Sequence, residues 1–206
     1  MSAIHCIFLD LGRTLVDLNL GSLADRMRML TGLGPEDLKR AVADDGLATA
    51  FETGSISEEI FYERVCNTLG RRVGRDEFFA AWNSIFVPEP ILPDALLARL
   101  AERARLWALS NTNSAHYRFL AEQYSFFRFF SGKVLSFEVG LQKPDARIFK
   151  RALELANVTA DRALFVDDHL PNVESARAVG IDAFQFTTPG QFVQEMRTRQ
   201  LLSNDE

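Results

Sequence analysis

The chain has 206 residues, of which 47% are hydrophobic and 25% charged, and its formal net charge is −5 with a pI near 5.3. This length and composition suffice for a buried core in one domain, or in one domain that carries an insertion. Acidic and basic residues are intermixed, without the basic stripe that follows a nucleic-acid backbone, so nucleic acid is disfavoured as a partner.

The N-terminal residues, the length of the uncharged runs and the two cysteines limit the class of protein further. Residues 1–5 lack a basic stretch followed by a long apolar one, and no uncharged run approaches the length of a bilayer span. We therefore expect a cytoplasmic protein with no membrane partner. Cys6 and Cys66 are far apart in the sequence, so we expect two buried thiols rather than a disulfide framework or a metal cluster.

The first apolar run ends in a single carboxylate. Phe8, Leu9 and Asp10 precede the loop Leu11-Gly12-Arg13-Thr14, so Asp10 lies where a strand stops and a glycine-containing loop begins. In an open α/β sheet, ligands bind at the carboxyl ends of the strands. Asp10 is therefore a candidate nucleophile or metal ligand. The alternative is an Asp that only turns the chain after the strand.

The next segment has a helical pattern from about Leu20 to Phe86. Leu23, Met27 and Leu30 share one helical face, and similar faces follow further along the segment. Ser22 with Asp25, and Ser55 with Glu58, have the spacing of capping boxes. We expect no strand within this segment.

From Pro93 onward, helical and strand patterns alternate. The expected strands are short apolar runs at 106–109, 134–137, 163–166 and 183–186. This alternation predicts an α/β fold with a doubly wound, Rossmann-like parallel sheet. We expect the catalytic core at 1–16 and 88–206 and an inserted helical cap at 17–87. The aromatic cluster at 124–130 is interpreted as core or interface.

Three further groups of polar residues follow strands or precede helices. Ser110 and Asn111 come after the strand that ends at Leu109, Lys143 precedes Pro144, and Asp167-Asp168 close an apolar run ahead of Asn172. Each group has an alternative interpretation as a helix cap, a surface lysine or a turn. Two adjacent carboxylates repel each other unless a cation or hydrogen-bond donors compensate them, and Mg²⁺ prefers such ligands.

These groups, taken in order, resemble the four motifs of the haloacid dehalogenase superfamily of hydrolases. Phe8 to Leu15 resembles the first motif, Leu109 to Asn113 the second, Gln142-Lys143-Pro144 the third, and Phe165 to Asp168 with Asn172 the fourth. The residues of these motifs are most similar to those of a bacterial branch of sugar-phosphate phosphatases that resembles α-glucose-1-phosphate phosphatase. The phosphatase domain of soluble epoxide hydrolase is a more distant resemblance.

The resemblance implies a mechanism and a partner. Asp10 would attack the phosphoryl group of a small phosphorylated substrate and form an aspartyl phosphate. Mg²⁺ would be held by Asp10, the backbone carbonyl of Gly12 and Asp168, with Asp167 or Asn172 nearby. The phosphoryl oxygens would accept hydrogen bonds from Ser110 and Asn111, and Lys143 would supply positive charge. The oligomeric state stays open.

One position departs from the usual phosphatase pattern. A second Asp, the general acid for the leaving group, normally stands two residues after the nucleophile, and here that position is Gly12. Its loss is tolerable if another group replaces it or if the leaving group departs easily, as in an anomeric or acyl phosphate. Two alternatives therefore stand beside the phosphatase: a metal-independent 2-haloacid dehalogenase, and a non-catalytic phosphate-binding protein.

Overall fold

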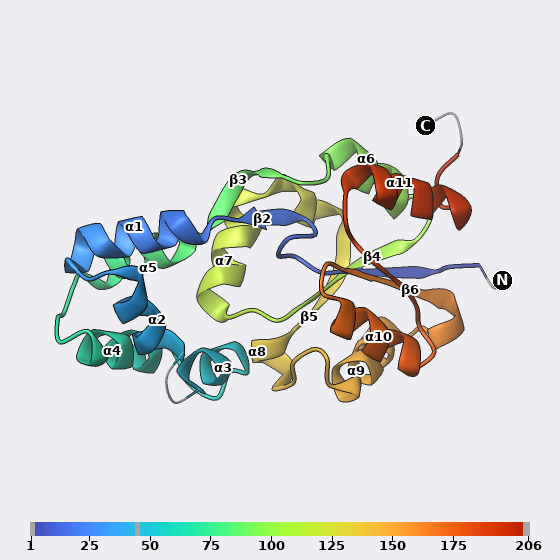
Figure 1. Ribbon diagram of the computed structural model, residues 1–206. Helices are drawn as coiled ribbons and strands as arrows, with labels where there is room; N and C mark the ends of the chain where they lie inside the picture. Colours follow the sequence, from blue (N-terminus) through green and yellow to red (C-terminus); the bar gives the residue numbers. More distant parts are fainter. Residues whose placement is uncertain (1–2, 44–45, 204–206) are drawn as a thin grey trace.

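The structure, a computed structural model, describes residues 3–43 and 46–203. A parallel sheet with helices on both faces occupies one half of the molecule, and a group of five helices lies beyond one edge of it (Figure 1). The strands follow the order β5-β4-β1-β6-β7, all pairs parallel. Their bounds are β1 (Cys6–Leu9), β4 (Arg105–Ser110), β5 (Phe130–Leu135), β6 (Ala163–Asp167) and β7 (Asp182–Gln185).

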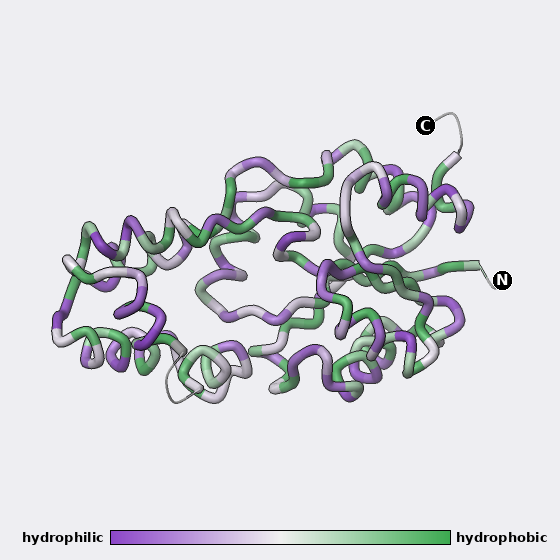
Figure 2. Tube along the Cα trace, viewed as in Figure 1, coloured by the Kyte–Doolittle hydropathy of each residue, from purple (hydrophilic) through white to green (hydrophobic). Residues whose placement is uncertain are grey.

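The sheet is buried on both faces, which explains the continuous apolar runs of its central strands. One face packs on α6 (Asp94–Ala101), α7 (Ser114–Gln123) and α11 (Pro189–Thr198), and the other on α9 (Ala146–Ala156) and α10 (Leu170–Ala178). The hydrophobic central strands pass between these amphipathic helices (Figure 2). The predicted doubly wound α/β fold is confirmed.

The strand predicted at 134–137 was placed too far along the chain. The structure has β5 at Phe130–Leu135, preceded by the 3-10 helix η2 (Ser125–Phe129), whereas the sequence pattern indicated a strand at 134–137. Ser136 instead begins the short helix α8 (Ser136–Val139). Its Oγ is fully committed to the backbone of Thr112, accepting from the N–H and donating to the C=O, each at 2.9 Å. This tertiary contact coincides with the end of the strand, and an apolar pattern cannot reveal it.

The group of five helices, here called the helical insert, packs around aromatic side chains of its own. The helices are α1 (Leu20–Thr31), α2 (Pro35–Ala43), α3 (Leu47–Glu52), α4 (Glu58–Thr68) and α5 (Arg75–Asn83). Phe51 stacks on Phe61 with ring centroids 4.3 Å apart, and Phe61 contacts the rings of Phe78 and Trp82. The helical pattern was therefore predicted correctly, while the division into cap and core at 17 and 87 stays a prediction.

The predicted helix starts in the insert were wrong by a few residues. Asn19, not Ser22, caps α1, because its side chain accepts the N–H of Ser22. Ser57, not Ser55, caps α4 by accepting the N–H of Ile60. In both cases a better-placed polar side chain displaces the one that the capping-box spacing indicated.

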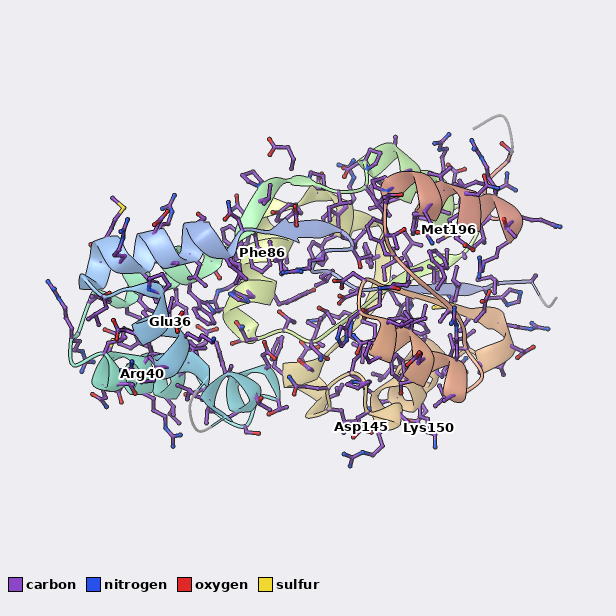
Figure 3. The ribbon with its side chains drawn as sticks, in the orientation of Figure 1. Glu36, Arg40, Phe86, Asp145, Lys150 and Met196 are labelled. Carbon is purple, nitrogen blue, oxygen red and sulfur yellow. The ribbon has the colours of Figure 1, made fainter. Side chains whose placement is uncertain are left out.

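A two-stranded antiparallel ribbon joins the insert to the sheet. It consists of β2 (Val16–Leu18) and β3 (Phe86–Pro90), which flank the insert in the sequence. Phe86 lies at this junction (Figure 3) and packs edge-on against the ring of His116, with centroids 4.9 Å apart. Strands this short carry too few residues for an alternating pattern, so the sequence did not predict the ribbon.

Two further expectations concern burial and membranes. Cys6 and Cys66 are both free and buried, and the aromatic side chains of Tyr124 and Phe126 are in the core, as predicted. Among the helices of the described residues, none has the length and apolar character needed to cross a bilayer.

Candidate active site

The predicted polar residues meet at the carboxyl edge of the sheet. Asp10 directly follows β1, Ser110 ends β4 and Asp167 ends β6, and these three strands are neighbours in the sheet. Leu9 pairs with Ala108 on one side and with Val166 on the other, so the register places the three strand ends side by side. The edge faces the helical insert (Figure 1).

Lys143 is the centre of this cluster. Its side chain is buried, and the ammonium Nζ lies 2.8 Å from Oδ1 of Asp10 and 2.6 Å from Oδ2 of Asp167. Nζ also donates to the carbonyl of Leu109 at 2.8 Å. All three ammonium hydrogens therefore have acceptors. Burial without these partners would be costly, and with them the lysine stays charged.

Asn111 fixes the backbone from which Lys143 projects. Its Nδ2 donates to the carbonyl of Lys143, and its Oδ1 accepts the N–H of Lys143, both at 2.8 Å. One of the two hydrogens on Nδ2 is thus committed to the lysine loop. Asn111 therefore positions Lys143, in addition to the phosphate contact that the resemblance implies for it.

Both carboxylate oxygens of Asp167 accept hydrogen bonds. Its Oδ1 accepts the backbone N–H of His169 at 2.8 Å, and Nδ2 of Asn172 lies 3.1 and 3.0 Å from its two oxygens. With the ammonium group of Lys143 as a further donor, this fully buried carboxylate is compensated without a metal ion. The sequence placed Asp167 at or near a metal; the geometry shows it first as the residue that anchors Lys143.

Three carboxylates are close enough to share an ion. One oxygen each from Asp10, Asp167 and Asp168 lies within 4.8 Å of the others. Asp168 is half-buried and forms no ion pair with any described residue, and the carbonyl of Gly12 accepts no hydrogen bond from them. Hard oxygen donors in this number suit Mg²⁺, which keeps several of its waters. The donor set therefore fits the predicted cofactor.

The charges in the cluster perturb one another. Burial, opposed by Lys143 and assisted by Asp167, raises the pKa of Asp10 to about 6. Burial and the neighbouring Asp167 charge also raise the pKa of Asp168. For Lys143, burial alone would lower the pKa, but the two carboxylates outweigh it and raise the pKa overall. The ammonium group is thus retained, while the carboxylates carry more negative charge than one lysine neutralises.

The loop after Asp10 leaves room at the position of the missing acid. A Cβ built on Gly12 would come no closer than 3.5 Å to another side chain, Cδ1 of Leu18, which is ordinary van der Waals contact. Gly12 does not adopt a left-handed backbone conformation; the neighbouring Arg13 does, with φ of 56°. A Cβ atom at position 12 is therefore excluded neither by its contacts nor by the backbone angle.

Ser110 lies where the sequence placed it, at the end of β4. Its side chain is buried, and among the described residues its Oγ makes only a long contact of 3.5 Å, with the carbonyl of Asn111. It therefore keeps its hydroxyl for another acceptor. Ser136, which holds the Thr112 backbone, was not singled out in the sequence because its role depends on a residue 24 positions away. The roles assigned to these residues stay predictions.

Comparison with known proteins agrees with this geometry. A family model described as haloacid dehalogenase-like hydrolase matches residues 6–180. The chain belongs to the haloacid dehalogenase-like hydrolase family. The match spans all four motifs and the helical insert between the first two, so the resemblance seen in the sequence is confirmed.

A known phosphatase and two crystal structures are similar to this chain over most of its length. The chain is 24% identical over 197 residues to a D-ribitol-5-phosphate phosphatase of Bacteroides thetaiotaomicron, covering 92% of this chain and 95% of the relative. It is similar to the crystal structure of the HAD family enzyme BT-2542 from that organism, with a TM-score of 0.84, 25% identity and coverage of 95% and 100% of the two chains. A complex of BT-2542 with magnesium and inorganic phosphate has a TM-score of 0.80, 26% identity and coverage of 91% and 96%.

Proposed function

We propose that this hydrolase is a Mg²⁺-dependent phosphatase that acts on a small phosphorylated metabolite through an aspartyl phosphate on Asp10. The observation that carries the proposal is the bridge from Lys143 to Asp10 and Asp167, with Asp168 beside it and free of any ion pair to a described residue. This arrangement supplies a nucleophile, a fixed cation and a second carboxylate for a metal in one buried cluster. Phosphoryl transfer needs these elements, because its catalysis is largely positioning and charge compensation.

The residues of the chain divide the reaction between them. An oxygen of Asp10 attacks phosphorus and displaces the leaving-group oxygen, which forms the aspartyl phosphate. Water then attacks the same phosphorus, which releases phosphate and restores the carboxylate. Lys143 orients Asp10 and compensates the charge of the phosphoryl oxygens, and Ser110 donates a hydrogen bond to one of them.

Magnesium fits the same proposal. Asp10, Asp168 and the carbonyl of Gly12 would hold it, and it would neutralise charge between the attacking carboxylate and the phosphoryl group. Asp167 would serve mainly through Lys143, because its oxygens already accept hydrogen bonds. The magnesium and phosphate bound by BT-2542 support this assignment.

The substrate class follows from the leaving group. Gly12 offers no acid to protonate a departing alkoxide, and an anomeric phosphate leaves more easily than the phosphate of a primary alcohol. A sugar 1-phosphate is therefore our specific proposal. The similarity to a D-ribitol-5-phosphate phosphatase supports a polyol or sugar as the organic part, but D-ribitol 5-phosphate is the phosphate of a primary alcohol, so the anomeric position rests on Gly12 alone.

A metal-independent dehalogenase is the second candidate. It rests on Gly12, since that reaction also needs no second acid. An L-2-haloacid dehalogenase, PA0810, shares the fold with this chain at 19% identity and a TM-score of 0.66, which shows the fold alone. The cluster of three carboxylates favours the phosphatase, since a metal-free reaction has no use for the free charge of Asp168.

Three measurements separate the candidate functions: phosphate release, chloride release and phosphate binding. Release of phosphate from p-nitrophenyl phosphate is measured with Mg²⁺, with a chelator, and with the Asp10→Asn variant. We expect turnover that stops in chelator, returns with Mg²⁺ and falls by several orders of magnitude in Asp10→Asn. Chelator-resistant release of chloride from 2-chloropropionate would identify the dehalogenase. Binding of phosphate without any turnover would identify a binding protein.

A further inference from the structure

In the proposed reaction, the leaving group departs from phosphorus toward the helical insert. This inference rests on the proposed phosphatase function. In phosphoryl transfer the attacking and leaving oxygens are roughly in line through phosphorus. Asp10 attacks from the end of β1, so the leaving group departs away from the sheet, on the side where the insert lies (Figure 1). Groups that the insert presents to this edge therefore meet the organic part of the substrate.

Among the described residues of the insert, the carboxylates of Glu52 and Glu58 accept hydrogen bonds from the sheet-bearing half of the molecule. Glu58 at the start of α4 accepts from Ser114 at 2.8 Å and pairs with Arg118 at 2.9 Å and with Arg75 at 3.2 Å. Glu58 is thus saturated and anchors α4 to the start of α7.

Glu52, at the end of α3, is different. Its Oε2 accepts a hydrogen bond of 2.8 Å from Nε2 of Gln142, and its Oε1 accepts none from any described residue. No described cation pairs with it, although its side chain is half-buried and burial raises its pKa.

Glu52 is linked to the loop of Lys143 through its hydrogen bond to Gln142. Gln142, its partner, is bonded directly to Lys143, whose Nζ holds Asp10. The peptide of Lys143 is in turn fixed by Asn111, the residue after Ser110. Glu52 is therefore hydrogen-bonded to the loop that carries Lys143.

The position of Glu52 is fixed by the turn that follows it. Gly54 has φ of +68°, and a Cβ on it would lie 2.1 Å from the carbonyl oxygen of Phe137 in α8. Only glycine fits this close approach, so the turn after α3 rests directly on α8. The carboxylate of Glu52 is consequently held against Gln142 instead of swinging freely on the surface.

We infer that Glu52, with Gln142, is a specificity-determining residue that binds hydroxyl groups of a neutral, polyhydroxylated leaving group. A carboxylate oxygen with a spare lone pair accepts hydrogen bonds from hydroxyls, and the amide of Gln142 provides both a donor and an acceptor beside it. An uncompensated negative charge here also disfavours substrates whose leaving group carries a carboxylate or a second phosphate, because like charges repel in a partly buried site.

The test compares Glu52→Ala and Glu52→Gln with wild type on four substrates. D-Ribitol 5-phosphate and glucose 1-phosphate carry hydroxyls, p-nitrophenyl phosphate carries none, and 3-phosphoglycerate carries a carboxylate. Glu63→Gln, which alters an exposed carboxylate of the same insert, is the matched control. Thermal unfolding of each variant checks the fold, and Glu52→Gln keeps the size of the side chain should the alanine variant unfold.

We expect Glu52→Ala to lower kcat/KM for the better hydroxylated substrate about 10- to 100-fold, mainly through KM, as for a lost hydrogen bond to a charged group. Hydrolysis of p-nitrophenyl phosphate should stay within about threefold, a change too small for a lost hydrogen bond of that kind. Glu52→Gln should raise the rate on 3-phosphoglycerate relative to the hydroxylated substrates, and Glu63→Gln should change none of these ratios.

Each other outcome has a defined meaning. Equal losses on aryl and hydroxylated phosphates, or no loss on either, would overturn the role of Glu52 and leave the proposed phosphatase standing. A wild-type enzyme that hydrolyses none of the four phosphates with Mg²⁺ would overturn the proposed function and the specificity role together.

Discussion

Lys143 and Asp167 form a buried ion pair with 2.6 Å between Nζ and Oδ2, and the same ammonium lies 2.8 Å from Asp10. The pair supports a role for Asp167 in positioning the lysine that contacts Asp10, the proposed nucleophile. Asp168, its neighbour in sequence, has no ion pair among the described residues and faces the same cluster. We therefore propose that the two adjacent carboxylates have different tasks.

The different tasks predict different defects. Asp167→Asn should lower kcat about 10- to 100-fold with little change in the Mg²⁺ concentration needed for half-maximal rate, because it loosens Lys143 and leaves the metal ligands in place. Asp168→Ala should instead raise that Mg²⁺ concentration strongly. Metal titrations of activity in both variants measure the difference, with thermal unfolding as the control for Asp167→Asn. Equal shifts of the Mg²⁺ requirement would show that both residues bind the metal directly.

Gly12→Asp should fold and should alter the choice of leaving group. The structure leaves ordinary contact distance around a Cβ at this position, and the backbone there is not left-handed. An acid at position 12 helps the poorest leaving group most, by up to about 10²–10⁴ in rate. The ratio of kcat/KM for glucose 1-phosphate over glucose 6-phosphate should therefore fall, with Gly12→Ala as the matched control. A wild-type ratio of one would refute the preference for anomeric phosphates.

The acid limb of activity should report the nucleophile. Burial raises the pKa of Asp10 to about 6, and the attacking species is the carboxylate, so kcat/KM should fall as the pH drops below about 6 at low Mg²⁺. Raising the Mg²⁺ concentration should move this limb to lower pH, because a cation favours the charged form. A pH profile at two Mg²⁺ concentrations checks both statements, and a limb that ignores Mg²⁺ would separate the metal from Asp10.

His116 should make the fold sensitive to acid. Its ring stacks on Trp82 and meets Phe86 edge-on, and burial lowers its pKa from 6.5 to about 4. The folded state thus binds fewer protons than the unfolded state between these values, so stability is full above about pH 6.5 and is lost as the pH falls toward 4.

The expected loss from His116 is on the order of 2 kcal/mol, less than the full shift because the ring is partly exposed. Chemical denaturation at pH 7 and pH 4.5 should show a smaller difference for His116→Gln than for wild type. His169→Gln, which alters a side chain on the exposed surface, is the control. An unchanged difference in His116→Gln would remove His116 as the source of the acid sensitivity.

Local sequence patterns correctly predicted the positions of the candidate site residues that lie at the ends of strands. Asp10, Ser110 and Asp167 each end an apolar run, and the structure places all three at the carboxyl ends of neighbouring strands. The helical pattern between about 20 and 86 was likewise readable, because its apolar faces repeat at helical spacing.

Features that depend on contacts between distant residues were not readable. The link from Lys143 to Asp167 joins residues 24 positions apart, and the hydrogen bond from Gln142 to Glu52 joins residues 90 apart. The β2–β3 ribbon and the true start of β5 also depend on such contacts, since each lacks a periodic pattern of its own. The hydrogen bond on which the proposed specificity role of Glu52 rests therefore had no local signature in the insert.

The most direct test of the mechanism is to trap the covalent intermediate. Wild type and Asp10→Asn are mixed with p-nitrophenyl phosphate and Mg²⁺, quenched in acid within the first turnover, and digested for mass spectrometry. The account predicts a phosphoryl group on the peptide that carries Asp10, localised to that residue, in wild type and none in Asp10→Asn. A phosphoryl group on another residue, or turnover by wild type with no phosphorylated Asp10 at any quench time, would contradict it.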